Sequence, residues 1–454
     1  MNIINNVVNN KWCIGCGMCA AICPRARLAI SWNERGEYNP KEVEENCAKC
    51  NENCSLCYQV CPAHGQTKNE TEVGTDLYGN ILGVHFRKET GYYLDSFVGY
   101  SNDHRATSAS GGMASWTLEA LLSSGEVDAV AAVGRTSNPD KLFEFKMCQS
   151  VEEIRDCGRS AYYPVEISQV IQYILHNEGR YAIIGLPCVC KSIRLAQDKL
   201  PKLKRRITHV LGLTCGHQCS KFFAEYICAL GGGDPHDLRE IIFRTKDLSQ
   251  PASNHGITFR SGEGDTLVHK QVLWKDGVGL AYTSGYFQLP GCFYCDDVFA
   301  ECADMTFMDA WLPDYVKDPE GTSLVVVRGK QINAMLQKAI SDDTISCHTL
   351  PIDKIIQSQR GVVHRKRVRK TEKGNTPQLR EDILKRPLFF MPNMSMLHKE
   401  IARKTSASWK IDKNHKRMFN HIRMLERKII FFSNIKNFFR VPYKILKKFI
   451  LVSK

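Results

Sequence analysis

The sequence predicts an α+β protein with a small cysteine-rich N-terminal domain, a larger α/β body and a basic helical tail. Nine of the 20 cysteines lie between Cys13 and Cys61, and strand-like runs alternate with helical patterns from Gly91 onward. Residues 395–454 hold 16 Lys and Arg against 3 Asp and Glu, so this segment alone carries 16 − 3 = +13. The other 394 residues hold 61 − 16 = 45 basic and 48 − 3 = 45 acidic residues and are neutral in sum. A length of 454 residues suggests about three domains. We divide the chain into a first domain (1–66), a linker (67–90), a body (91–345), a basic linker region (346–394) and the tail (395–454).

Two cysteine runs occupy the first domain. Their patterns are Cys13-x2-Cys16-x2-Cys19-x3-Cys23-Pro24 and Cys50-x3-Cys54-x2-Cys57-x3-Cys61-Pro62. In such runs three thiolates of one tight loop bind one 4Fe–4S cluster, and the fourth cysteine crosses over to the neighbouring cluster. The predicted ligands are Cys13, Cys16, Cys19 and Cys61 for one cluster, and Cys23, Cys54, Cys57 and either Cys50 or Cys47 for the other.

Two alternative uses of these cysteines have to be compared with iron–sulfur ligation. A disulfide scaffold needs an oxidising compartment, and the polar start MNIINNVVNNKW does not have the pattern of a secretory signal. Zinc binds CxxC pairs, but two four-cysteine runs that each end in Cys-Pro favour iron–sulfur clusters. The sequence contains no run of 18 apolar residues, so it predicts no membrane-spanning helix. We therefore expect a cytoplasmic protein with a bacterial-ferredoxin-like head that carries single electrons.

The body follows an alternating pattern of strands and helices. Apolar runs predict strands over 127–134, 181–187 and 207–215, and helical spacing predicts helices over 113–124, 166–177 and 220–230. This alternation favours an α/β arrangement. The stretch TSASGG (107–112) precedes one of these helices and forms a candidate anion site, because free N–H groups and the helix dipole would face a ligand. An ordinary glycine-containing helix cap explains the same stretch.

Four cysteines of the body could hold a third cluster. Cys188 and Cys215 each follow a strand-like run, and Cys292-x2-Cys295 adds a pair. Four thiolates suffice for one 4Fe–4S cluster, although spacing alone does not bring them together. Buried structural cysteines are the alternative. Three further cysteines could replace one of these ligands: Cys190, Cys219 and Cys302.

Several motifs in order resemble one known family. They are RATSASGG (105–112), CGRSAYY (157–163), GLPCVCKSIR (185–194), LTCGH (213–217), FRTKD (243–247), CFYCDDVFAECADMTFMDAW (292–311) and GTSLVVVR (321–328). Together with the head, this pattern resembles the family of β subunits of coenzyme F420 hydrogenase and related dehydrogenases, over roughly three quarters of the chain. The resemblance implies an α/β flavin and iron–sulfur body with one FAD and a 4Fe–4S cluster held by Cys188, Cys215, Cys292 and Cys295. It also places a set of residues at the flavin: Ser108, Ser110, Gly111, Gly112, Arg159, Ser160 and Tyr162.

Two departures from the family pattern leave the substrate open. Met308 stands where a glycine is usual, and Gln218-Cys219 interrupts a segment that is commonly Val-Pro-Ser. The proton donor is also unassigned. Histidines are the candidates, because a near-neutral pKa suits proton delivery. The candidates are His104, His209, His217 and His255, and His217 is the first choice because it follows Cys215 by two residues.

The tail combines an apolar stripe with basic residues. Ile422, Leu425, Ile429 and Phe432 recur at three- and four-residue spacing among Lys and Arg. Such basic amphipathic helices suit an anionic membrane surface, while helices packed on the body are the alternative. No base-reading motif accompanies the charge, so nucleic acid is not expected as a partner.

The predicted function is that of an iron–sulfur flavoprotein oxidoreductase. Its partner would be a redox protein such as ferredoxin or an electron-carrying coenzyme. We expect it to lie in the cytoplasm, either free or peripherally bound to the inner membrane face. The alternatives are an electron-transfer subunit without catalysis of its own and a scaffold protein with structural clusters.

Overall fold

The fold is described from a computed structural model, which describes residues 2–43, 54–368, 420, 423–424 and 427. The predicted tail (395–454), apart from those four positions, lies outside the described residues, and so does most of the basic linker region. Cys47 and Cys50 are also outside them, so the choice between these two ligands stays a prediction.

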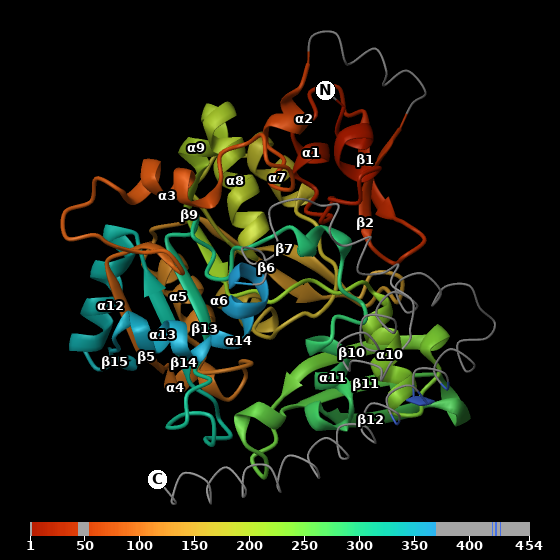
Figure 1. The fold of residues 1–454 in the computed structure, drawn as a ribbon. Helices are drawn as coiled ribbons and strands as arrows, with labels where there is room; N and C mark the ends of the chain where they lie inside the picture. Colours follow the sequence, from red (N-terminus) through yellow and green to blue (C-terminus); the bar gives the residue numbers. More distant parts are fainter. Residues whose placement is uncertain (1, 44–53, 369–419, 421–422, 425–426, 428–454) are drawn as a thin grey trace, which may run out of the picture.

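The head is a small domain with short helices and one hairpin (Figure 1). A π-helical turn (Ile4–Val8) precedes α1 (Met18–Ala21), β1 (Leu28–Trp32), β2 (Tyr38–Glu42) and α2 (Leu56–Gln59). β1 and β2 pair antiparallel. Helix α1 begins after Gly17, which has φ = 86° and whose added Cβ would lie 2.4 Å from the Glu166 carboxylate. Only glycine therefore suits this point, where the cysteine loop meets the body.

An eight-stranded mixed sheet forms the centre of the body, in the order β15-β5-β14-β13-β9-β8-β6-β7. Its inner strands β13, β9, β8 and β6 run parallel to one another, and the outer pairs are antiparallel. The strands are β5 (Asp95–Tyr100), β6 (Ala129–Arg135), β7 (Phe143–Cys148), β8 (Tyr181–Gly185), β9 (Ile207–Leu213), β13 (Met305–Asp309), β14 (Ser323–Val327) and β15 (Ser346–Thr349).

Helices cover both faces of this sheet. One face packs against α7 (Ser168–His176), α8 (Pro187–Lys199) and α9 (Pro201–Arg206), and the other against α5 (Met113–Ser123), α6 (Val151–Asp156) and α12 (Lys330–Ser341). On β6, Ala129 and Ala131 face the first layer while Val130 and Ala132 face the second, as the two-residue period of a strand requires. Both layers are apolar, so the inner strands are buried on both sides.

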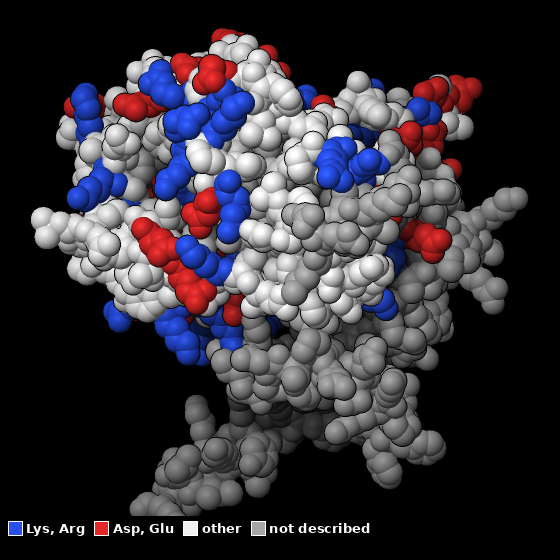
Figure 2. All heavy atoms as spheres, turned by 90° about the horizontal axis from the view of Figure 1, so that it is seen from above, with Lys and Arg blue, Asp and Glu red and all other residues white. Residues whose placement is uncertain are grey.

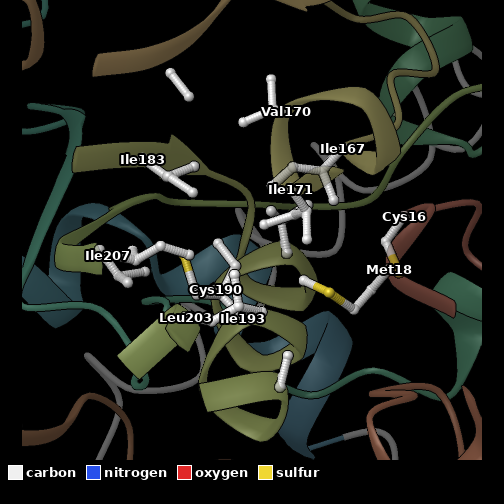
Figure 3. Packing of buried hydrophobic residues seen from close by; sticks show 14 of the residues in the cluster. Cys16, Met18, Ile167, Val170, Ile171, Ile183, Cys190, Ile193, Leu203 and Ile207 are labelled. Atoms are coloured by element: carbon white, nitrogen blue, oxygen red, sulfur yellow. The ribbon is translucent and has the colours of Figure 1, made fainter. Parts of the chain in front are cut away.

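The head shares a hydrophobic core with the body. Figure 3 shows Cys16 and Met18 of the head packing beside Ile167, Ile171 and Ile193, which lie at the start of α7, within α7 and within α8. A backbone hydrogen bond of 2.9 Å from Ile167 N to Cys16 O joins the two parts. The cysteine loop is therefore held in a defined position against the body.

A second, smaller sheet packs on α10 (Phe222–Leu230) and α11 (Val278–Thr283) (Figure 1). Its antiparallel strands are β10 (Leu238–Thr245), β11 (Gly256–Ser261) and β12 (Val268–Leu273). Short 3-10 turns occur at Pro235–Asp237, Ala252–Asn254, Gly264–Thr266, Trp274–Asp276 and Pro290–Phe293. Strand β10 ends within the motif FRTKD, and an ion pair between Arg244 and Asp309 joins that motif to β13 of the main sheet.

The structure corrects two segment assignments. The predicted linker 67–90 contains α3 (Glu70–Tyr78) and β3 (His85–Arg87), which pairs with β4 (Gly91–Tyr93). Helix α3 has a capping box between Asn69 and Glu72, and it packs on the body, where Tyr78 donates a hydrogen bond of 3.0 Å to Asp304. The body also continues past 345, through β15, α13 (Ile352–Ser358), α14 (Arg360–Val363) and a π-helical turn (His364–Val368).

The predicted regular elements of the body are confirmed. The strands expected over 127–134, 181–187 and 207–215 are β6, β8 and β9, and the three expected helices are α5, α7 and α10. Figure 2 shows basic and acidic side chains on the same face of the described surface, in keeping with a body that carries both signs of charge. No helix among the described residues is long and apolar enough to cross a membrane.

Candidate functional site

The head gathers its thiols into two neighbouring groups. Burial raises the pKa of the Cys19 thiol, and other sulfurs raise it further: Cys16, Cys13, Cys61 and Cys57. Cys61 is influenced in the same way by Cys16 and Cys13. These four cysteines, Cys13, Cys16, Cys19 and Cys61, are the set predicted for the first cluster.

The second group contains the remaining described cysteines of the head. Burial raises the pKa of the Cys57 thiol, and the sulfurs of Cys23 and Cys54 act in the same direction. Cys23 comes from the first run and the other two from the second, so the chain crosses over between the two groups as the run pattern predicts.

The body brings four distant cysteines together. Cys188 is the second residue of α8, Cys215 follows β9, Cys292 lies in the turn Pro290–Phe293 and Cys295 follows that turn. Burial raises the pKa of the Cys188 thiol, and four nearby sulfurs raise it further: Cys215, Cys295, Cys292 and Cys16. The last of these belongs to the head, so the body thiols adjoin the first cysteine group of the head.

Nitrogen donors surround the body thiols. The Gln218 backbone N–H donates to Cys292 Sγ at 3.3 Å, and its side-chain Nε2 donates to Cys188 Sγ at 3.3 Å. Lys366 Nζ lies 3.4 Å from Cys295 Sγ and 2.7 Å from Asp297 O. Burial alone would lower the pKa of Lys366, but the sulfurs of Cys295 and its neighbours outweigh it and raise the pKa. The departure at Gln218 thus provides hydrogen bonds to sulfur.

The alternative body cysteines differ in their surroundings. Cys190 is fully buried and its thiol donates to the carbonyls of Leu211 and Gly185 at 3.4 and 3.6 Å. Cys219 is near the candidate ligands, since the sulfurs of Cys292 and Cys215 raise its pKa in addition to burial. Cys219 therefore stays an alternative ligand.

The donor set fits iron–sulfur clusters better than free thiols. Ionised sulfurs that crowd a buried space repel one another, and a cationic iron core removes that repulsion. No three His, Cys, Asp or Glu side chains of the described chain converge closely enough for a single metal ion. A 4Fe–4S cluster places each thiolate on a different iron, so its ligands stand further apart than those of one ion.

The candidate anion loop lies between α4 (Asn102–Arg105) and α5 and is tightly packed. A Cβ on Gly111 would lie 2.6 Å from Gly99 O and from Ser323 N. Gly112 caps α5 with φ = 79°. Ser110 Oγ donates to Thr322 O at 2.9 Å, and Ser108 Oγ lies 3.3 Å from Ser115 Oγ. Both glycines are therefore required by the geometry of this turn.

Basic residues of β10 and its neighbours face this loop. Lys246 Nζ donates to Ser110 O at 3.0 Å and also to Arg105 O. Arg244 Nη2 donates to Ala109 O at 3.2 Å, and its guanidinium forms a two-pronged ion pair with Asp309 at 2.7 and 2.8 Å. Burial lowers the pKa of Lys246 to about 8, and the charge of Arg105 lowers it in the same direction.

Arg159 adds positive charge to the same region. In the described part of the chain no carboxylate forms a salt bridge with it, and its charge contributes to the lowered pKa of Lys246. The start of a helix beside cations whose charges lower the pKa of Lys246 fits a phosphate-bearing ligand such as FAD. Ser160 follows Arg159 and is half-buried.

An aromatic cluster lies near the body thiols. Tyr162 lies against Phe243 and Tyr282 at ring separations of 5.4 and 5.1 Å. His217 stacks on Tyr282 at 4.3 Å with an interplanar angle of 22°. Both ring nitrogens of His217 are buried and without a hydrogen-bond partner among the described residues. Such rings form an apolar wall with polar groups available for a flat ligand.

The candidate proton donors do not behave alike. Burial and the charge of Arg365 hold the pKa of His217 well below its ordinary value, so the ring is neutral. His217 therefore does not have the near-neutral pKa that made histidines candidates for the proton donor. His104 is engaged by Ser101 and Glu119 at 2.9 and 2.6 Å. Burial lowers the pKa of His209, and it lowers that of His255 to about 3. The proton donor therefore stays a prediction.

Three basic residues beside the sites were not singled out from the sequence. Arg244 and Lys246 lie in the motif FRTKD, whose order marked it as meaningful without indicating what it contacts. Lys366 lies in a run of basic residues whose composition suggests a solvent-exposed linker. Its burial beside Cys295 depends on α13 and α14 returning the chain to the body.

Comparison with known proteins agrees with these observations. Residues 96–172 match the N-terminal model of the coenzyme F420 hydrogenase/dehydrogenase beta subunit, and residues 178–352 match the C-terminal model of the same family. Residues 12–65 match a 4Fe-4S dicluster domain. The described head and body thus define an iron–sulfur protein with an α/β body. The chain belongs to the family of coenzyme F420 hydrogenase/dehydrogenase beta subunits and carries a 4Fe–4S dicluster domain at its N-terminal side.

Two curated relatives and one solved structure are similar to this chain. A subunit of F(420)H(2) dehydrogenase from Methanosarcina mazei is 25% identical over 223 residues, 47% of this chain and 55% of the relative. The coenzyme F420-dependent sulfite reductase of Methanocaldococcus jannaschii is 24% identical over 342 residues, 72% of this chain and 45% of the relative. The chain thus spans about half the length of these relatives. A chain of the F420-reducing NiFe hydrogenase complex from Methanosarcina barkeri matches with a TM-score of 0.48 and 17% identity, over 64% of this chain and 95% of that one.

Proposed function

We propose that this protein is an iron–sulfur flavoprotein oxidoreductase. It would pass electrons between a one-electron carrier such as ferredoxin at the head and a substrate or coenzyme at a bound FAD. The observation that carries the proposal is the contact between head and body, where the sulfur of Cys16 is close enough to raise the pKa of the Cys188 thiol. Two cysteine groups of a ferredoxin-like head thereby continue into a third group inside the body. The names of both curated relatives, a dehydrogenase subunit and a reductase, support redox chemistry.

The chain's own residues supply binding, orientation and charge. A flavin accepts a hydride or two electrons and releases them singly, whereas 4Fe–4S clusters carry one electron at a time. The loop 107–112, Lys246 and Arg159 would bind the flavin phosphates. The aromatic wall of Tyr162 and Tyr282 would orient the ring system beside the thiols of the body. Lys366, which is buried, holds a positive charge next to Cys295.

The basic residues near the loop and the ring of His217 would have different roles in binding. Arg244 is neutralised by Asp309 and so positions the loop rather than attracting a ligand. Arg159 and Lys246 have no such ion pair among the described residues, which leaves their charge available to an anion. The neutral ring of His217 would offer one N–H and one acceptor to a flat ligand bound beside these aromatic rings.

A second candidate is an electron-transfer subunit whose chemistry takes place in a partner. One curated relative is named as a subunit, which supports assembly with other chains. The two candidates differ in flavin content. A relay needs no FAD, whereas the oxidoreductase requires it.

Anaerobic purification followed by iron, sulfide and flavin analysis tests the proposal. We expect about twelve irons and one FAD per chain, because three 4Fe–4S clusters are predicted. Reductive titration with a low-potential donor should then reduce clusters and flavin reversibly. Twelve irons without flavin would favour the relay, and eight irons or fewer without flavin would contradict the oxidoreductase.

A further inference from the structure

Two cysteines outside the candidate cluster ligands lie in contact at an edge of the main sheet. Cys148 is the last residue of the edge strand β7, and Cys157 directly follows α6. Their Sγ atoms are 3.8 Å apart. Cys148 is only 1% exposed, whereas Cys157 is half-buried. A disulfide bond is about 2.05 Å long, so bonding would need the two sulfurs to approach by roughly 1.8 Å.

The surroundings distinguish the two sulfurs. A Cβ added to Gly134 on β6 would lie 2.9 Å from Cys157 Sγ and 3.0 Å from Lys146 Cδ. The missing side chain of Gly134 thus leaves the space through which the Lys146 side chain runs past the thiol. The hydrogen bond with Cys148 and then the charge of Lys146 lower the pKa of Cys157, while burial, Asp156 and Glu153 act against them. The same hydrogen bond and burial raise the pKa of Cys148.

We propose that Cys148 and Cys157 form a reversible dithiol–disulfide site that reacts with low-molecular-weight disulfides. Cys157 is the attacking sulfur because it is the more exposed residue of the two and because it ionises before its partner. Cys148, protected in the core, is the sulfur that completes the bond. The thiolate is the reactive form in such exchange, which makes the asymmetry of the pair functional.

The exchange balances in two steps. The Cys157 thiolate attacks one sulfur of the small disulfide, so a mixed disulfide forms and one small thiolate leaves. Cys148 then gives up its proton and attacks the Cys157 sulfur, so the Cys148–Cys157 bond forms and the second small thiolate leaves. The two protein sulfurs lose two electrons and two protons, and the small disulfide takes them up as two thiols.

Closure of the bond would move the stretch that carries Arg159. Cys148 lies in a regular strand, whereas Cys157 lies at a helix end, so most of the movement falls on Cys157. Arg159 N donates to Cys157 O at 3.0 Å, and a Cβ on Gly158 would lie 3.6 Å from Ser115 Oγ, which contacts Ser108 in the candidate anion loop. Oxidation would thereby weaken flavin binding, a consequence that rests on the proposed function while the disulfide itself does not.

The chain is suited to a direct test. Trypsin cleaves after Lys146, Arg155 and Arg159, which places the two cysteines on separate peptides, 147–155 and 156–159. The anaerobically purified full chain is equilibrated with glutathione and glutathione disulfide at graded ratios, quenched in acid, alkylated and digested. We expect the linked peptide pair to rise from near absence to the major species and to disappear after dithiothreitol. Cys347 in the same digest, half-buried and without a neighbouring thiol in the described chain, should stay alkylated.

Two outcomes would overturn the site. Either both peptides stay alkylated at every ratio, or Cys157 accumulates as the glutathione adduct while Cys148 is alkylated. The variant Cys148→Ser should trap that adduct on Cys157, which identifies the attacking sulfur. If Cys148 in the variant Cys157→Ser formed the adduct as fast as Cys157 does in Cys148→Ser, the assignment of the attacking sulfur would be wrong.

Flavin affinity tests the coupling separately. Oxidised wild type should bind FAD about ten-fold more weakly than reduced wild type, the loss expected for one hydrogen bond to a charged group. The variant Cys157→Ser should show no difference between the two conditions. A disulfide that forms without any change in FAD affinity would refute the coupling. Absence of FAD binding in both states would instead count against the proposed function and leave the peptide result standing.

Discussion

Replacing Lys366 by methionine should lower the reduction potential of a cluster bound by Cys188, Cys215, Cys292 and Cys295. The Lys366 side chain is buried, with 8% of the residue exposed, and its Nζ lies 3.4 Å from Cys295 Sγ. A buried cation stabilises the reduced cluster more than the oxidised one, because reduction adds a negative charge. Methionine keeps a similar length and apolar stem but removes the charge.

The distance sets the size of the effect. One unit charge at 3.4 Å contributes about 5 kcal/mol at an effective dielectric constant of about 20, which is an upper bound. The added electron spreads over the whole cluster, and at about twice that distance the interaction is about 2.4 kcal/mol. For a one-electron couple, at about 59 mV for each ten-fold change, this corresponds to a downward shift of roughly 100 mV.

An anaerobic redox titration of the full chain, followed by electron paramagnetic resonance, measures this shift. Lys338→Met is the matched control, since the Lys338 side chain is 78% exposed on α12 and screened by solvent. Lys366→Arg keeps the charge and should retain most of the wild-type potential. Iron analysis establishes that each variant holds its clusters. An unchanged or raised potential in Lys366→Met with full iron content would refute the reasoning.

Four further predictions concern the head, the anion loop and the tail. Cys16→Ala should lower the iron content from about twelve to about eight per chain, whereas Cys347→Ala should leave it unchanged, as iron analysis of both variants would reveal. Because the folded-state pKa of Lys246 is about 8 instead of 10.5, FAD affinity should fall by up to about ten-fold per pH unit above pH 8 in wild type and stay flat in Lys246→Met. The flavin-free chain should meanwhile gain stability between pH 8 and 10.5 in thermal unfolding, since the unfolded state binds more protons there. Deleting 395–454 should abolish co-sedimentation with anionic vesicles, and equal binding by the shortened chain would contradict a membrane role for the tail.

The spacing of cysteines within a short run predicts a metal site well, because the geometry of the cluster ligands restricts the length and shape of the loop that carries them. The run pattern predicts a crossover in the head, and the sulfurs of Cys16 and Cys23 are near those of Cys61 and Cys57, as such a crossover would require. The inner strands β6, β8 and β9 were likewise predictable, since a central strand that is buried on both faces requires a continuous apolar run.

Contacts between distant segments could not be predicted in the same way. The convergence of Cys188, Cys215 and Cys292 depends on α8, β9 and a turn after the small sheet meeting at one place, and only the family resemblance suggested it. Lys366 and the segment 67–90 show the same limit, because polar composition alone suggests a linker while tertiary packing decides its structure. The local sequence of a polar segment does not show which part of the protein it packs against.

The two cysteine groups of the head lie at different distances from the body. Cys16 is the head cysteine that acts on Cys188, so the group of Cys13, Cys16, Cys19 and Cys61 lies next to the body. Cys23, Cys54 and Cys57 form the other group, which meets the first through Cys57 and Cys19. Electron transfer favours short steps between neighbouring centres, so a one-electron partner would reach the body through this outer group.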